Sequence, residues 1–210
     1  MKNLSLSLLI IGLTFISCKK EETQKPEETV SKEEIASETK PDSATVAKAW
    51  ADYATPSKAH EMLAKDTGTW DADMTFWMEG NPEPQKAKSV AVYRMILDGK
   101  YQEGIYKGDM WGMPFEGRGM TAYDNASKEY IATWVDNMGT GMLVSRGKYD
   151  EATKTLTFNG AMVDPVTGKE KMIKEIITYI DENTQKMEMF DIDANKKEFK
   201  TMEILSKRRK

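Results

Sequence analysis

The chain has 210 residues, and its 30 Lys and Arg nearly balance its 34 Asp and Glu, which leaves a formal net charge of −4. Basic residues gather only at the end, in residues 207–210, so the charge pattern argues against nucleic acid as a partner. The one cysteine cannot form an internal disulfide, and a folded domain must therefore be held together by its hydrophobic core.

The start of the chain has the layout of a bacterial lipoprotein signal. Met-Lys-Asn is followed by an apolar run at residues 4–16, then by Ser17 and by Cys18. The run is shorter than the ~20 residues that a spanning helix needs, which indicates an export signal. We therefore expect residues 1–17 to be a signal peptide and Cys18 to carry the lipid that anchors the protein in a membrane. An ordinary secretory signal in which Cys18 has no role is the alternative.

The segment at residues 18–44 is rich in Glu, Lys, Thr and Pro and has few apolar residues. Such a composition cannot bury enough surface to offset its ordering entropy, so we expect a disordered tether behind the lipidated cysteine. Lys19 replaces the Asp of an inner-membrane retention signal, which favours the outer membrane of the cell envelope. The periplasmic side and the cell surface both stay open as locations.

The remaining residues, 45–210, have the size of a single domain and begin with helical signals. Residues 45–53 predict a short helix. Thr55 and Pro56 supply an N-cap and a first helical position for a second helix that ends near Lys65. One or two short helices therefore precede the rest of the domain.

The rest of the domain predicts strands. After Trp70, apolar residues alternate with polar ones, which is the period of a strand with one buried face. The same period predicts further strands at residues 89–97, 101–110, 115–123, 129–136, 141–149, 154–163, 171–180, 186–192 and 198–205.

The segments between these strands carry turn signals. Asp98 precedes Gly99, and later turns open with an Asp and close with a Lys, as in residues 124–128 and 150–154. Such hairpins in series predict an all-β domain, and about ten antiparallel strands usually close into a single up-and-down barrel. A two-sheet sandwich is the alternative.

Three motifs resemble a known family. They read Gly-Thr-Trp at residues 68–70, Trp-Gly-Met-Pro-Phe-Glu-Gly-Arg-Gly at residues 111–119 and Thr-Trp-Val-Asp-Asn-Met-Gly-Thr-Gly at residues 133–141. Together they resemble an uncharacterised bacterial family, domain of unknown function 1579, over nearly all of residues 56–207. The resemblance implies a secreted or lipidated protein with a calycin-like barrel, the fold of lipocalins, fatty-acid-binding proteins and nitrobindin-like proteins. It implies no activity, because the family has none assigned.

The motif region supplies candidate ligand-binding residues, which are Tyr106, Trp111, Phe115, Arg118, Tyr123, Trp134 and Asp136. Our main hypothesis is that the barrel interior binds a small, largely apolar ligand, with Arg118 or a tyrosine orienting its polar group. Gly117 and Gly119 either leave room for a ligand against Trp134 or relieve strand curvature. An envelope interaction or scaffold module with a filled barrel is the alternative.

Signals for catalysis and for cofactors are weak. A small-molecule hydrolase that uses Glu116 with Asp136 is a third hypothesis. His60 is the only histidine, and we expect it to cap or pack one end of the barrel. Nitrobindin-like relatives hold haem through a histidine on a late strand, and this chain has none after His60. Residues 191–195 begin like a calcium loop, but Lys196 replaces the required glycine, so we expect a hairpin turn there, no metal and no cofactor.

Methionines crowd the motif region at Met110, Met113, Met120, Met138 and Met142. Thioethers fill irregular apolar spaces and adapt to ligands, and they also suit Cu(I) as soft ligands. We expect these methionines to fill the core or a cavity, with copper as the alternative.

Overall fold

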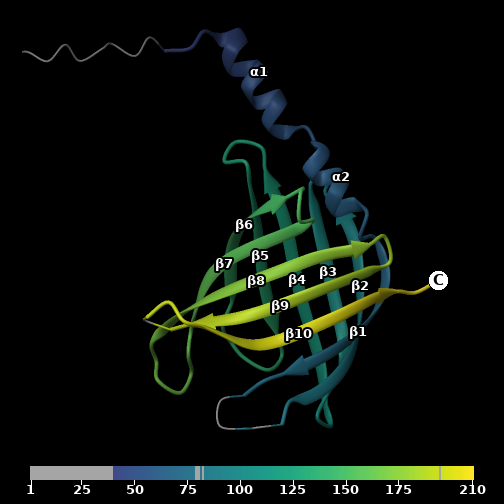
Figure 1. Cartoon of the computed structure of the whole chain (residues 1–210). Helices are drawn as coiled ribbons and strands as arrows, with labels where there is room; N and C mark the ends of the chain where they lie inside the picture. The colour runs from purple at the N-terminus through teal and green to yellow at the C-terminus, as the bar shows by residue number, and fades with distance from the viewer. Residues whose placement is uncertain (1–39, 79–80, 82, 194) are drawn as a thin grey trace, which may run out of the picture. The chain divides into compact units, whose positions relative to one another are not determined.

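The computed structural model describes residues 40–78, 81, 83–193 and 195–210. The predicted signal peptide, Cys18 and nearly all of the predicted tether lie outside these residues. One compact unit runs from Pro41 to Lys210 and contains two helices followed by ten strands (Figure 1). The helices are α1 (Ser43–Ala54) and α2 (Lys58–Ala64), and the strands are β1 (Gly68–Phe76), β2 (Gln85–Ile96), β3 (Tyr101–Met110), β4 (Met113–Asp124), β5 (Glu129–Asp136), β6 (Leu143–Asp150), β7 (Thr155–Val163), β8 (Glu170–Asp181), β9 (Thr184–Ile192) and β10 (Glu198–Arg208). Within the described part of the chain, neither helix has the length and apolar character needed to cross a membrane.

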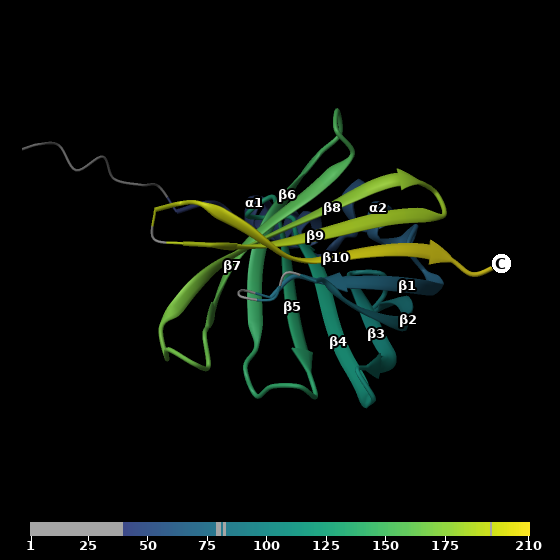
Figure 2. The ribbon, with the colours of Figure 1, turned by 60° about the horizontal axis from the view of Figure 1, so that its bottom comes forward.

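The strands form a closed antiparallel barrel. Each strand pairs with its neighbour in the chain, and β10 returns to pair with β1, where Arg208 lies opposite Trp70. Closure leaves no unpaired sheet edge, which is a common solution for a long meander. Figure 2 shows the walls crossing, with β8, β9 and β10 running across β3, β4 and β5. The barrel confirms the fold expected from the sequence, and the sandwich alternative was wrong.

Alternation decides which face of each strand lines the lumen, the space inside the barrel. In β1, Trp70, Ala72 and Met74 are buried, whereas Asp71 and Asp73 between them are exposed. Successive side chains of a strand point to opposite faces, so this pattern turns the apolar residues inward. The hydrophobic core therefore lies in the lumen.

The hairpin turns are built as the sequence predicts. The carboxylates of Asp124, Asp150, Asp164 and Asp181 each accept a backbone N–H two residues further on, at 2.7 to 2.9 Å. These bonds hold the pKa of the first three carboxyls below their usual value. Gly99 in the β2–β3 turn has a φ of 77°, in the left-handed region that glycine tolerates without strain.

α2 covers one end of the barrel. Its Leu63 is 1% exposed, and the Gln102 side chain of β3 donates to the Leu63 carbonyl at 2.7 Å. The helix begins after Ser57, whose backbone N–H donates to His60 Nδ1 at 2.9 Å in a capping box. His60 thus caps α2 and packs against the barrel, as expected. The N-cap predicted at Thr55 was wrong, because Thr55 instead ends α1 and its hydroxyl donates to a carbonyl of that helix at 2.7 Å.

α1 has its own N-cap but little packing. The Asp42 carboxylate caps its first turn, and none of its residues is buried. Asn125 in the β4–β5 turn donates from Nδ2 to the carbonyls of Asp52, Tyr53 and Thr55 at 2.7 to 3.2 Å. These hydrogen bonds attach the end of α1 to the barrel.

The first and last strands are clamped at the α2 end. The Trp70 indole N–H donates to the Asp66 carbonyl at 2.7 Å, and the Arg208 guanidinium lies 4.2 Å from the Trp70 ring centroid. Arg208 also donates to the carbonyls of Thr67 and Lys65, at 2.6 and 2.5 Å. With a closed sheet, its own core and this clamp, the compact unit has what a domain needs to fold alone.

Candidate functional site

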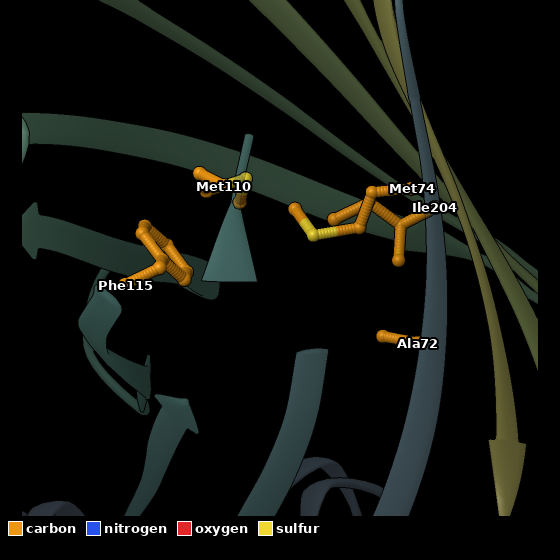
Figure 3. Packing of buried hydrophobic residues seen from close by; sticks show 5 residues of the cluster. All are labelled: Ala72, Met74, Met110, Phe115 and Ile204. Carbon is orange, nitrogen blue, oxygen red and sulfur yellow. The ribbon is translucent and has the colours of Figure 1, made fainter. Parts of the chain in front are cut away.

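Two groups of side chains fill much of the lumen. Near the strand ends far from α2, Met74 of β1, Met110 of β3 and Phe115 of β4 meet. Figure 3 shows Met74 reaching from β1 toward Met110 and Phe115. The second group lies under α2 and consists of the buried residues Leu63, Tyr130, Leu156 and Phe158.

An internal cavity of about 70 Å³ lies within the second group. Its walls are formed by Leu63, Asp66, Tyr93, Gln102, Tyr106, Thr121, Leu156, Phe158, Ile177, Tyr179 and Gln185. Four of these residues are apolar and the other seven carry polar groups, so the wall is mixed, and small-molecule sites also combine apolar side chains with converging polar groups. The polar groups therefore decide what the cavity can hold.

Asp66 is a buried acid at the α2 end of this cavity. Its carboxylate accepts hydrogen bonds from the side-chain amides of Gln102, at 3.1 Å, and Gln185. Burial raises the pKa of Asp66 to about 6, although both amides and the Arg208 charge act in the opposite direction. Asp66 ties the segment before β1 to β3 and β9, and its hydrogen bonds are satisfied by the protein itself.

Two tyrosines form a second polar group. The hydroxyls of Tyr93 and Tyr106, on β2 and β3, are hydrogen-bonded to each other. Burial raises the pKa of Tyr106 to about 12 and that of Tyr93 well above its usual value, so both remain neutral phenols. Because one hydroxyl donates to the other, one O–H of the pair is left to donate to a ligand.

Glu175 is a second acid that faces the lumen, on β8, and it is half-buried. Its neighbours across the sheet are Phe158 of β7 and Met189 of β9, and it shares the lumen face of β8 with Ile173 and Ile177. Burial raises the pKa of Glu175 to about 7 and is the cause of the change. Acids with such a pKa gather at functional sites, which makes Glu175 a candidate functional residue.

Five of the residues predicted to bind a ligand lie on the lumen side of the barrel, and they are Tyr106, Phe115, Tyr123, Trp134 and Asp136. Phe115 and Trp134 are stacked, with ring centroids 6.4 Å apart, and the Tyr106 ring meets Trp134 edge-on at 4.9 Å. Tyr123 lies under α2, where its ring meets His60 edge-on at 5.8 Å. The five residues are therefore divided between the two ends of the lumen.

The motif at residues 133–141 fastens the β5–β6 loop to β4. The Trp134 indole N–H donates to Asp136 at 2.7 Å, and the other carboxylate oxygen accepts a loop N–H at 2.9 Å. Asn137 donates to the Pro114 carbonyl and accepts the Glu116 N–H, both at 2.9 Å. Protein donors thus occupy both carboxylate oxygens of Asp136, which gives this part of the motif a structural role.

The glycines of the motif at residues 111–119 make room for Trp134. A Cβ added to Gly117 would lie 2.5 Å from the Trp134 ring, and one on Gly119 would lie 3.5 Å from it. The sequence left open whether Gly117 and Gly119 make room for a ligand or relieve strand curvature. The Trp134 ring fills the space that these glycines leave.

Arg118 and Trp111 lie outside the lumen. Arg118 is on the outer face of β4 and donates to the Glu116 side chain at 3.1 Å, because the alternation that turns Phe115 inward turns Arg118 outward. This corrects the expectation that Arg118 orients a ligand in the interior. Trp111 sits in the β3–β4 turn, is 44% exposed and packs against Phe76 with ring centroids 5.3 Å apart.

The two carboxyls of the hydrolase hypothesis, Glu116 and Asp136, lie on opposite faces of the barrel wall. Glu116 lies on the outer face of β4, where Arg118 and Lys107 hold the pKa of its carboxyl below the usual value. Asp136 lies on the lumen side of β5, so the barrel wall separates the two carboxyls. The structure does not bring them together.

The methionines of the motif region are divided between the core and the surface. Met110 is 4% exposed and fills the core, as expected. The expectation was wrong for Met113, Met120, Met138 and Met142, which are exposed at 40% or more.

No metal site is apparent in residues 40–78, 81, 83–193 and 195–210, where no group of three His, Cys, Asp or Glu side chains converges. Burial lowers the pKa of His60, whose Nδ1 accepts the Ser57 N–H. Asp193 accepts backbone N–H donors from Asn195 and Lys197, both at 2.8 Å, so this segment is the turn that the sequence predicts.

Sequence reasoning missed Asp66, Glu175 and the two glutamines. For Glu175 a signal exists, since alternation places it on the same face as Ile173, Ile177 and Tyr179. A charged residue on an otherwise apolar face is a recognisable exception. Asp66 gives no such signal, because it precedes the first strand and its partners come from distant strands.

Comparison with known proteins places the chain in a family. A model for the family described as "Protein of unknown function (DUF1579)" matches residues 55–208, and no curated protein matches the sequence. Rv2717c from M. tuberculosis, a crystal structure, is 12% identical with a TM-score of 0.56, over 74% of this chain and 100% of that one. The S-type phycobiliprotein lyase CPES from Guillardia theta is 10% identical with a TM-score of 0.51, over 81% and 99%. These likenesses show the barrel fold alone. Because the family model covers well over half of the sequence, the chain belongs to the DUF1579 family.

Proposed function

We propose that the barrel binds a small, largely apolar ligand in its lumen. The observation that carries this proposal is the internal cavity, which is lined by apolar side chains such as Leu156, Phe158 and Ile177 together with polar ones that include the Tyr93–Tyr106 pair. One structural neighbour is a phycobiliprotein lyase, so a barrel of this fold serves in a protein with a chemical activity. The neighbour's name does not identify a ligand for this chain.

The cavity limits the size of the ligand. Its volume of about 70 Å³ is roughly half that of an engineered cavity of about 150 Å³ that binds benzene. A ligand of a few heavy atoms fits without rearrangement. A larger one requires the methionines packed at the other end of the lumen, Met74, Met187 and Met202, to change rotamer, which their flexible side chains allow.

The test is an NMR titration of residues 41–210, purified without denaturation, with n-butanol and benzene as probes. We expect backbone amides beside the cavity to shift and saturate. Thr121→Leu fills the cavity from β4 and should abolish these shifts, whereas Thr133→Leu, opposite the exposed Met120 and Val144 on the outer face, should leave them intact. If no lumen amide responds to either probe in the unmodified protein, the proposal fails.

A filled-barrel interaction module is the second candidate. It is favoured by the packing of Met74, Met110 and Phe115 at one end and by the Trp134 ring over Gly117. Cross-linking in intact cells should then recover a stable partner of the barrel, and the titration above should show no binding.

We also propose that the protein is a lipoprotein anchored through Cys18, on the strength of its N-terminal sequence. Replacing Cys18 by Ala should move the protein from the membrane fraction to the soluble fraction. Because Cys18 precedes the compact unit, the melting temperature of the barrel should not change. A variant that still sediments with membranes would contradict the anchor.

A further inference from the structure

Resting on the proposed lumen site, we propose that its ligand carries a protonated amine or another N–H donor, which the Glu175 carboxylate binds together with the Ser89 hydroxyl. The proposal names the polar half of a ligand whose remaining part is apolar. It follows from two polar side chains on the lumen face, the half-buried Glu175 and the buried Ser89, for which the described residues supply no hydrogen-bond partner.

Glu175 lies next to the cavity. Its neighbour Phe158 on β7 and the next inward residue of its own strand, Ile177, both form cavity walls. Tyr106 faces the same lumen from β3 and also lines the cavity, and the charge of Glu175 is one of the causes that raise its pKa. A ligand in the cavity can therefore reach Glu175 without leaving the lumen.

Glu175 also lacks a counter-charge. Across the residues that the structure describes, no Lys, Arg or His forms an ion pair with it, and no side chain donates a hydrogen bond to it. The other charges inside the barrel are already engaged, because Lys171 pairs with Asp191 at 2.7 Å and Asp66 accepts from two glutamines. A buried charge is costly unless it is paired, so the carboxyl is prepared for a cation or an N–H donor.

Ser89 supplies an independent observation. It is 5% exposed on the lumen face of β2, and its Oγ is the one fully buried side-chain N or O atom in the described chain that has no hydrogen-bond partner. Ser89 lies opposite Gly108 of β3, one inward position from Tyr106. A hydroxyl without a partner loses its hydrogen bond to water on burial and regains one only from a bound molecule.

The experiment compares two probes of equal shape, n-butylamine and n-butanol, titrated into residues 41–210 at pH 8 and followed by NMR. A charge-assisted hydrogen bond favours the amine, and we expect it to bind about tenfold more tightly than the alcohol. Glu175→Gln should remove this preference. Glu116→Gln, the same change at an exposed carboxyl on the outer face, should retain it. Ser89→Ala should weaken amine binding about threefold.

The outcomes separate this inference from the proposed function. Equal affinity for the two probes, or a preference that survives Glu175→Gln, overturns the role of Glu175 while lumen binding stands. Absence of binding by both probes overturns the proposed function itself. If Glu175→Gln does not fold, the pKa of Glu175 is measured in the unmodified protein with and without n-butylamine. Bound amine should lower this pKa by about one unit from its value of about 7. An unchanged pKa at saturating amine contradicts the contact.

Discussion

The pH dependence of stability offers a direct test of the lumen-facing acid on β8. The pKa of Glu175 in the folded protein is about 7, against an ordinary value of 4.5, because burial disfavours its charged form. The folded state thus holds the proton more tightly than the unfolded chain. The cost of burying Glu175 is absent below pH 4.5, grows as the pH rises and is complete above about pH 7.

The magnitude follows from the two values. Their difference of 2.5 (7 − 4.5), at about 1.4 kcal/mol for each pKa unit, corresponds to roughly 3.5 kcal/mol of unfolding free energy at high pH. Roughly 1 kcal/mol of this is present at pH 5, so the change between pH 5 and pH 8 is roughly 2.5 kcal/mol. Glu175→Gln removes the charge, and the variant should gain this amount relative to the unmodified protein over that interval.

The assay is urea unfolding followed by tryptophan fluorescence, with both proteins measured at pH 5 and pH 8. Any cost of burying the new amide is independent of pH and cancels in the comparison. Glu116→Gln is the control, because Arg118 lowers the pKa of that exposed carboxyl and its removal should act in the opposite direction, weakly. An equal difference between Glu175→Gln and the unmodified protein at both pH values would refute the assignment of a raised pKa.

Two further substitutions test the packing of the barrel. Gly117→Ala places a Cβ 2.5 Å from the Trp134 ring and should lower the unfolding free energy by about 1–3 kcal/mol, whereas Gly139→Ala, with nothing within 4 Å, should be nearly neutral in the same urea assay. Arg208→Met removes the hydrogen bonds to three backbone carbonyls and a cation–π contact and should cost roughly 2–3 kcal/mol, measured by thermal unfolding. Arg209→Met, which breaks an exposed ion pair, should cost less than about 1 kcal/mol, and equal losses for the two arginines would contradict the clamp.

The strands were predictable because their period is local. Alternation in residues 101–110 and 129–136 fixes both the strand and its inward face, and the structure has β3 and β5 at these bounds. β2 begins at Gln85 rather than at residue 89, since its first residues are polar and are held by pairing with β1, as in Gln85 opposite Phe76. Such pairing is a tertiary effect that a single strand's sequence does not report.

The site was predictable only where alternation was applied consistently. Phe115 and Trp134 were placed correctly on the lumen side, and the same rule applied to Arg118 would have placed it outside. Glu175 lies outside the family motifs of residues 111–141, and its only sequence signal is alternation on β8, which places this acid among isoleucines. Asp66 depended on hydrogen bonds across the barrel, from Gln102 and Gln185, and could not be found from local sequence.

The two ends of the barrel differ in how easily they can rearrange, and for the proposed lumen ligand this difference favours one route of exchange. At the α2 end, Arg208 donates to three backbone carbonyls and Gln102 makes buried hydrogen bonds to both α2 and Asp66, so opening this end breaks several hydrogen bonds at once. The far end is closed by Met74 and Met110, whose side chains change rotamer at low cost. Longer loops surround that end, and the family motif fixes one of them through Asn137. A ligand bound as proposed would therefore reach Glu175 past the methionine end, and the motif at residues 133–141 holds the loop at that end in place through Asp136 and Asn137.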